Sequence, residues 1–192
     1  PCSSSKLAAA SAPVMTVPSG TSVIAVRQVV PPTHTHSFTT PTVFVAVSDG
    51  VLVTADSLTR KVLDLASGTP VALEAAWNAQ LHASVAAVTF SSGEVWLWTG
   101  RIGVLVASGT KDPVVGLGQS PTNGLPLVAV KQDGNVQSFF LRPVKTLVSA
   151  GSTVDGVDTF AVGGSNAVFY SDLKTQELRT ETLSPVGKYL RR

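Results

Sequence analysis

Short apolar runs, each broken by a tight turn, recur along most of the chain. Asp-Gly, Ser-Gly and Ser-Asn pairs stand at the breaks, and such pairs tolerate the positive φ angles of a two-residue hairpin turn. The pattern predicts consecutive β-hairpins. The four clearest ones read VFVAVSDGVLVTA, VAAVTFSSGEVWLW, LVAVKQDGNVQSFF and TFAVGGSNAVFYS, with turns at Asp49-Gly50, Ser92-Gly93, Asp133-Gly134 and Ser165-Asn166.

These turns recur at a nearly constant spacing. Successive turns are 43, 41 and 32 residues apart, and a period of about forty in an all-β chain is typical of β-propeller blades. Three further segments, 61–73, 102–117 and 168–183, each read as a strand, a polar turn and a second strand. We therefore expect an all-β fold of successive antiparallel hairpins with propeller-like repeats and at most one short helix.

Only residues 70–85 are compatible with that helix. In PVALEAAWNAQLHASV, four apolar residues recur at helical spacing. They are Leu73, Ala76, Trp77 and Leu81.

Composition divides the chain into three parts. Residues 1–42 are rich in Pro, Ser and Thr, which predicts an arm or linker. Within them, the strand-like stretch 21–30 is mostly apolar on both faces, so we expect it to dock on the domain that follows. That β domain, of about four repeats, is expected over residues 43–183, and residues 184–192 form a basic, solvated tail.

The strand and corner motifs resemble WD-repeat propeller blades. In LDLASG and SDLKTQ, Leu63 and Ser171 stand where that family has tryptophan, and the family's Gly-His pair is absent. The resemblance covers roughly residues 42–183. It implies a non-catalytic scaffold for protein–protein interaction. About four blades are fewer than most closed rings use, so a protein partner or self-association is expected to cover the open sheet edges.

Two other interpretations remain open. The segments 45–65 and 127–148 also resemble the opening strands of polo boxes, which would imply a module that docks a phosphorylated or other protein partner. A viral coat protein with a jelly-roll fold, working in capsid assembly, is the third, because the chain has few charges and is rich in Val, Thr, Ser and Pro.

Charge and cysteine content narrow the partners and the location. Charged residues make up 14% of the chain and the net charge is +2, too little to indicate a nucleic acid or an anionic membrane as partner. No apolar run is long enough to span a membrane. Cys2 is the only cysteine, so no internal disulfide can form, and the first residues do not read as a signal peptide. These features favour an intracellular location.

Candidate chemistry is sparse. His34 and His36 have a spacing that suits a metal ion, but a solvated loop is the favoured interpretation. No Gly-x-Ser-x-Gly elbow is present, and GLGQSPTNG (116–124) lacks the Gly-Lys-Ser/Thr ending of a phosphate-binding loop. We expect no enzyme activity, no metal and no cofactor.

Six residues are candidates for partner binding. Trp96 and Trp98 lie on one face of the strand EVWLW, where core packing is favoured, although exposed tryptophans would dominate an interface. Four basic residues flank predicted turns and suit an acidic or phosphorylated peptide. They are Arg60, Lys61, Arg142 and Lys145.

Overall fold

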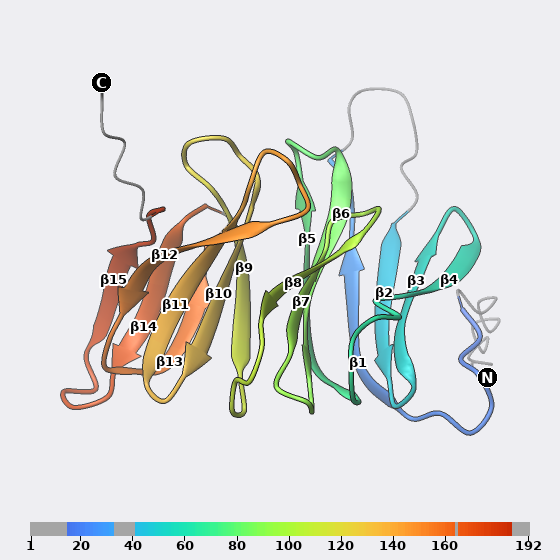
Figure 1. Cartoon of the computed structure of the whole chain (residues 1–192), viewed down its shortest axis with the longest axis horizontal. Coiled ribbons are helices and arrows are strands. Elements are labelled where there is room, and N and C mark those ends of the chain that lie inside the picture. The colour runs from blue at the N-terminus through green and yellow to red at the C-terminus, as the bar shows by residue number, and fades with distance from the viewer. Residues whose placement is uncertain (1–14, 33–40, 164, 186–192) are drawn as a thin grey trace, which may run out of the picture.

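The computed structural model describes residues 15–32, 41–163 and 165–185, in which four antiparallel sheets follow one another (Figure 1). We call the sheets blades 1 to 4. Blade 1 holds β1 (Val23–Val29), β2 (Thr42–Val47), β3 (Gly50–Ala55) and β4 (Leu58–Val62). Blade 2 holds β5 (Pro70–Asn78), β6 (Ala83–Phe90), β7 (Val95–Trp98) and β8 (Gly103–Ala107). Blade 3 holds β9 (Val114–Gln119), β10 (Pro126–Gln132), β11 (Asn135–Leu141) and β12 (Val148–Val154), and blade 4 holds β13 (Val157–Val162), β14 (Ala167–Asp172) and β15 (Leu178–Thr182).

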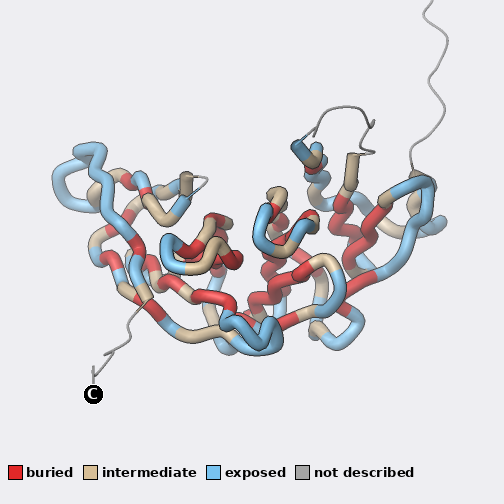
Figure 2. Tube along the Cα trace, turned by 90° about the horizontal axis from the view of Figure 1, so that it is seen from above, coloured by how far each residue is buried: buried red, intermediate tan, exposed pale blue. Residues whose placement is uncertain are grey.

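The blades are arranged along an open arc. Within each blade, strand order follows sequence order. The first strand of each blade contacts the first strand of the next, so that β1, β5, β9 and β13 form the inner row. Seen from above, the blades curve around this row, with blades 1 and 4 at opposite ends (Figure 2). The expected all-β fold with propeller-like repeats is confirmed.

The structure corrects the register of the repeat. The predicted turns near Asp49, Ser92 and Asp133 each join the second and third strands of a blade. The turn at Ser165-Asn166 instead joins the first and second strands of blade 4. The equivalent turn of blade 4 spans residues 173–177, inside the segment 168–183 that the sequence pattern groups with 61–73 and 102–117. With that correction the period of about forty continues through the fourth blade, and the irregular spacing of 32 disappears.

The helix considered for residues 70–85 does not form. This segment gives β5, a loop and the start of β6. Leu73, Ala75 and Trp77 alternate along β5 and pack toward blade 1, so the two-residue period of a strand describes them better than helical spacing. No helix occurs in the described residues, and none there is long and apolar enough to cross a membrane.

Apolar packing between blades forms the core. Three clusters of buried side chains lie between successive blades, with Phe44, Leu73 and Val88 in the first. Leu97 and Val128 belong to the second, and Leu127, Phe140 and Val168 to the third. Burying one such side chain contributes about 1.5–3 kcal/mol. The blades therefore depend on their neighbours for stability.

Two glycines let blades 3 and 4 approach closely. A Cβ atom at Gly118 would lie 2.3 Å from the Ser165 carbonyl oxygen, and one at Gly116 would lie 2.6 Å from Val162 Cγ2. The segment GLG, part of the stretch compared with a phosphate-binding loop, is thus strand β9, in which glycine makes room for the backbone and side chains of the next blade.

Candidate functional site

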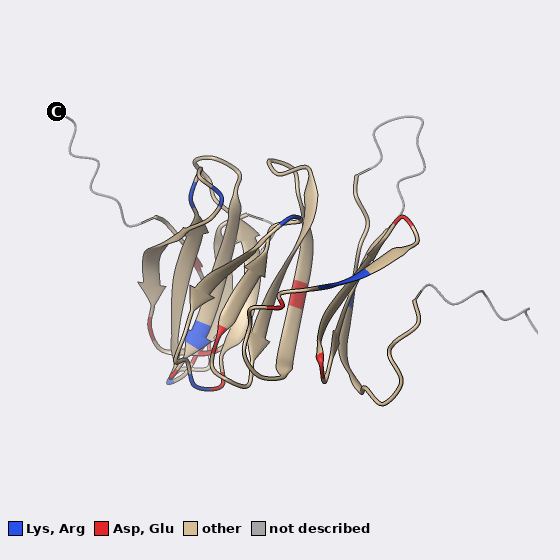
Figure 3. Ribbon diagram, turned by 45° about the vertical axis from the view of Figure 1, so that its right-hand side comes forward, with Lys and Arg blue, Asp and Glu red and all other residues tan. Residues whose placement is uncertain are grey.

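The two ends of the strands carry opposite charge (Figure 3). At the upper end in Figure 1, the described loops 56–57, 79–82, 99–102, 120–125 and 142–147 hold three basic residues (Arg101, Arg142 and Lys145) and one carboxylate, Asp56. At the lower end, loops 48–49, 63–69, 91–94, 108–113, 133–134, 155–156 and 173–177 hold two lysines and seven carboxylates: Asp49, Asp64, Glu94, Asp112, Asp133, Asp155 and Glu177. We call these the cationic end and the acidic end.

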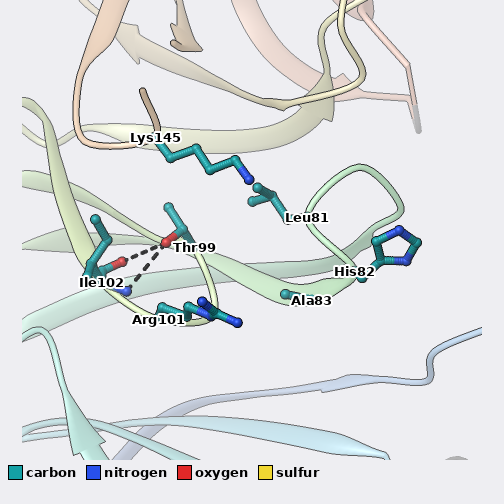
Figure 4. A pocket seen from close by; sticks show the side chains of 8 residues that line it. Leu81, His82, Ala83, Thr99, Arg101, Ile102 and Lys145 are labelled. Atoms are coloured by element: carbon teal, nitrogen blue, oxygen red, sulfur yellow. Dashed lines mark hydrogen bonds between the residues drawn. The ribbon is translucent and has the colours of Figure 1, made fainter. Parts of the chain in front are cut away.

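A pocket of about 460 Å³ opens at the cationic end (Figure 4). Its walls come from the loops between β5 and β6, β7 and β8, and β11 and β12, so that blades 2 and 3 both contribute. No carboxylate lines it. The lining residues are Leu81, His82, Ala83, Thr99, Gly100, Arg101, Ile102 and Lys145.

Asn78 fixes the β5–β6 wall of the pocket. Its side chain, at the end of β5, is 1% exposed. The Nδ2 atom donates a hydrogen bond to the Gly124 carbonyl at 2.9 Å, and Oδ1 accepts one from the Leu81 backbone N–H at 2.9 Å. One buried amide therefore ties the β5–β6 loop of blade 2 to the β9–β10 loop of blade 3.

Thr99 and Gly100 shape the turn that presents Arg101. The Thr99 backbone N–H donates to the Ile102 carbonyl at 3.0 Å, and the Thr99 hydroxyl donates to the same oxygen at 3.1 Å. Gly100 has a φ of +91°, and a Cβ there would lie 2.6 Å from the Ala83 Cβ. Glycine is thus required by both conformation and space, because the turn packs directly against β6.

Lys145 reaches the pocket from blade 3. Its backbone N–H donates to the Arg142 carbonyl at 2.7 Å, which closes the turn between β11 and β12. Figure 4 shows its side chain extending toward Leu81. Neither Lys145 nor Arg101 makes an ion pair within the described residues. Their charges are thus available to a ligand.

The arrangement suits an anion carried on a partly apolar group. Arg101 supplies a planar donor fork and Lys145 a point charge. His82 adds an imidazole ring that can donate a hydrogen bond. Leu81 and Ile102 offer apolar surface beside them. A carboxylate or phosphate on a peptide side chain fits this combination.

The structure places Trp96 and Trp98 away from this pocket. Both are buried, at 9% and 8% exposure, and both belong to the apolar cluster between blades 1 and 2. The Trp96 indole N–H donates to Glu94 at 2.9 Å. Glu94 also accepts from the Ser67 backbone N–H at 2.8 Å, and these two hydrogen bonds, the backbone one first, lower the pKa of the Glu94 carboxyl.

Arg60 and Lys61, neighbours on β4, point to opposite faces. The Arg60 guanidinium stacks over the Trp98 ring, 5.5 Å from its centre, and donates to the Gly100 carbonyl at 3.3 Å. Arg60 thus braces the turn that carries Arg101. Lys61 instead pairs with Asp49 at 3.3 Å, on the other face of blade 1.

Of the six sequence candidates, only Lys145 lines the pocket. Arg60 lies beside it, Arg142 belongs to the same β11–β12 loop, and the other three lie elsewhere. Arg101 and His82 were not among the sequence candidates. The Thr-Gly-Arg-Ile-Gly turn at residues 99–103 is the signal that points to Arg101, because the flanking glycines mark it as exposed at a loop tip.

The other candidates for metal chemistry gain no support. No group of three His, Cys, Asp or Glu side chains that could hold a metal ion occurs in residues 15–32, 41–163 and 165–185. Cys2, His34 and His36 lie outside these ranges.

Comparison with known proteins supports the fold. No protein-family model and no curated protein sequence matches the chain. The N-terminal propeller BBS1N, solved in complex with ARL6DN and soaked with mercury, is similar with a TM-score of 0.54 and 15% identity. The match covers 84% of this chain and 49% of that one. The Dos1 propeller has a TM-score of 0.39 and 13% identity, over 77% of this chain and 46% of that one.

This chain therefore spans about half the length of either neighbour. At such low identity, the likeness to BBS1N shows the architecture alone: a series of β-propeller blades.

Proposed function

We propose that the chain is a non-catalytic scaffold for protein–protein interaction, and that its cationic end binds an acidic segment of a partner protein. The observation that carries the proposal is the pocket of about 460 Å³, which Arg101, Lys145 and His82 line without any carboxylate. The separation of charge between the two ends gives the surrounding surface the same preference.

Rigidity of the walls favours this role. Asn78 holds the β5–β6 loop, and Gly100 and Arg60 hold the β7–β8 turn, by buried or stacked contacts. On these two walls a ligand meets groups already in place. A neighbour of similar fold, BBS1N, has been solved in complex with the protein ARL6DN, which is in keeping with a propeller that binds protein.

No observation favours either alternative function. A polo-box-like module would need a six-stranded sheet crossed by a helix, whereas the described residues form four separate sheets without a helix. A jelly roll packs two sheets face to face, and a coat protein therefore gains no support from this arc of blades.

The test measures binding of a fluorescently labelled oligoglutamate peptide by anisotropy. Arg101→Glu and Lys145→Glu are each expected to weaken binding by roughly tenfold or more, because each replaces a charge-assisted hydrogen bond with repulsion. Added salt should weaken the wild-type complex as well.

Lys111→Glu and Lys174→Glu, at the acidic end, are the matched controls, since they make the same change of charge. Equal losses in controls and pocket variants would indicate attraction to net charge alone. Such a result, or no binding by the wild-type chain, would contradict the proposal.

A further inference from the structure

The two terminal blades expose sheet faces of a kind that the inner blades bury. Blade 4 packs one face on blade 3 and leaves the other free. The free face carries Phe169, 53% exposed, and Leu178, 88% exposed, around a hollow of about 330 Å³. Strand alternation and register give this face six uncharged side chains: Thr159, Ala161, Phe169, Ser171, Leu178 and Thr180. Arg179 also lines the hollow, and its guanidinium forms ion pairs with Asp172 and Glu177.

Blade 1 has a matching free face on its inner strand. Ile24 and Val26 are 39% and 50% exposed and point away from blade 2. Val45 on β2 and Leu52 on β3 lie on the same face as Val26, because the register pairs Val26 with Val45 and Val45 with Leu52. Those outer positions are buried, with Met15 and Val17 packed over them.

Residues 15–17 lie where the outer strand of a preceding blade would lie. At the end of β4, the outer strand of blade 1, Val62 and Leu63 pack against Trp96 of blade 2. Met15 and Val17 pack in a similar way on β2 and β3 of blade 1. The connections agree too. Seven residues separate β4 from β5 and six separate β8 from β9, while five separate Val17 from β1.

Among the described residues, blade 4 has three strands, and β15 is the edge strand, paired only with β14. Residues 15–17 would supply a fourth strand beside it. Residues 15–17 make no backbone hydrogen bond to another described residue. An unpaired strand edge and an unpaired extended segment thus occur at the two ends of one arc.

We infer that a second copy of this chain closes the ring, with blade 4 of each copy packed on blade 1 of the other. Residues 15–17 of one copy then add to β15 of its partner as the fourth strand. The result is a two-fold ring of eight four-stranded blades, within the range of about four to eight that propellers use.

Two observations favour a second copy as the occupant. Both free faces are mainly apolar, as an interface between blades requires, and the charged side chains at them, Lys61 in blade 1 and Arg179 in blade 4, already form ion pairs within the chain. One copy supplies both an unpaired segment and the edge it fits, so two copies satisfy each other with none left over. This inference does not depend on the cationic end.

The first test is the solution mass by light scattering after size exclusion. A mass of twice 19.8 kDa is expected. Phe169→Lys, on the free face of blade 4, and Val26→Glu, on that of blade 1, should each give monomers, since each buries an unpaired charge at the interface. Leu65→Glu, at an 83% exposed loop position, is the control and should stay dimeric.

Mixing the two monomeric variants provides the decisive step. In the proposed head-to-tail ring, one interface of a mixed pair is wild type. The other sets the introduced lysine of one chain against the introduced glutamate of its partner, in opposite charge, so the dimer should return. A dimer built on a single face would not be restored in this way.

A wild-type chain that stays monomeric at every concentration would overturn the inference, and would leave the free faces to another protein or to further blades of a longer chain. So would a dimer that survives both substitutions. Leu178→Lys replaces Phe169→Lys if circular dichroism shows that the latter unfolds.

Discussion

Asn78 and Glu94 show how single polar side chains organise the loops at opposite ends of blade 2. Asn78 is buried and joins two loops at the cationic end. Glu94 joins the Ser67 backbone to the Trp96 indole at the acidic end. Each side chain provides a hydrogen-bond partner for backbone groups that find none on the backbone of their loops.

Asn78→Ala should destabilise the fold by about 1–3 kcal/mol, because it leaves the Gly124 carbonyl and the Leu81 N–H without their partner in a buried site. Urea denaturation measures the change. Gln80→Ala, at an exposed position of the same loop, is the control and should change stability little. Equal effects of both substitutions would show that the bridge has no special role.

Glu94 should give the fold an acid-sensitive component. Its pKa is lowered in the folded chain, so its stabilising effect is complete above its ordinary pKa of about 4.5 and is lost as the pH falls through the folded-state value. Glu94→Gln should cost about 1 kcal/mol or less at neutral pH, since solvent screens this half-buried group.

Thermal melts across acid pH, followed by tryptophan fluorescence, check this expectation. The difference between wild type and Glu94→Gln should shrink as the pH drops. A difference that stays constant with pH would mean that the Glu94 charge contributes nothing.

At the scale of elements, the hairpins were predictable because their signals are local. Asp133-Gly134, with φ values of +49° and +75°, forms the tight turn that the residue pair indicates. The place of each hairpin within a blade was not predictable. Ser165-Asn166 and Asp133-Gly134 both mark turns, but only contacts between blades tell which strand is innermost.

Gly118→Ala should loosen blade 4. The added Cβ would meet the Ser165 carbonyl at 2.3 Å, so β13 and β14 must shift away from β9 at a cost of about 1–3 kcal/mol. Faster amide exchange in β13 and β14, measured by mass spectrometry, is the expected result. Gly163→Ala, where a Cβ makes only ordinary contact at 3.5 Å, is the control. Unchanged exchange in Gly118→Ala would contradict the close packing of blades 3 and 4.

At the scale of the whole molecule, the pocket could not be found from sequence. Arg101 and Lys145 are separated by more than forty residues and come from different blades, and a net charge of +2 hides the opposite charges of the two ends. The alternation of strands does predict that hairpin turns fall at two ends. Assigning each turn to its end requires the complete strand order, which residues 70–85 and 163–177 left uncertain.

Strand order also bears on how the chain folds. Every hydrogen-bonded strand pair in the four blades joins strands that are consecutive in sequence. Each blade therefore closes only short loops, which lowers the entropic cost of reaching its native pairing. As the chain leaves the ribosome, blade 1 can pair before blade 2 is synthesised, and each later blade then finds an apolar template already formed.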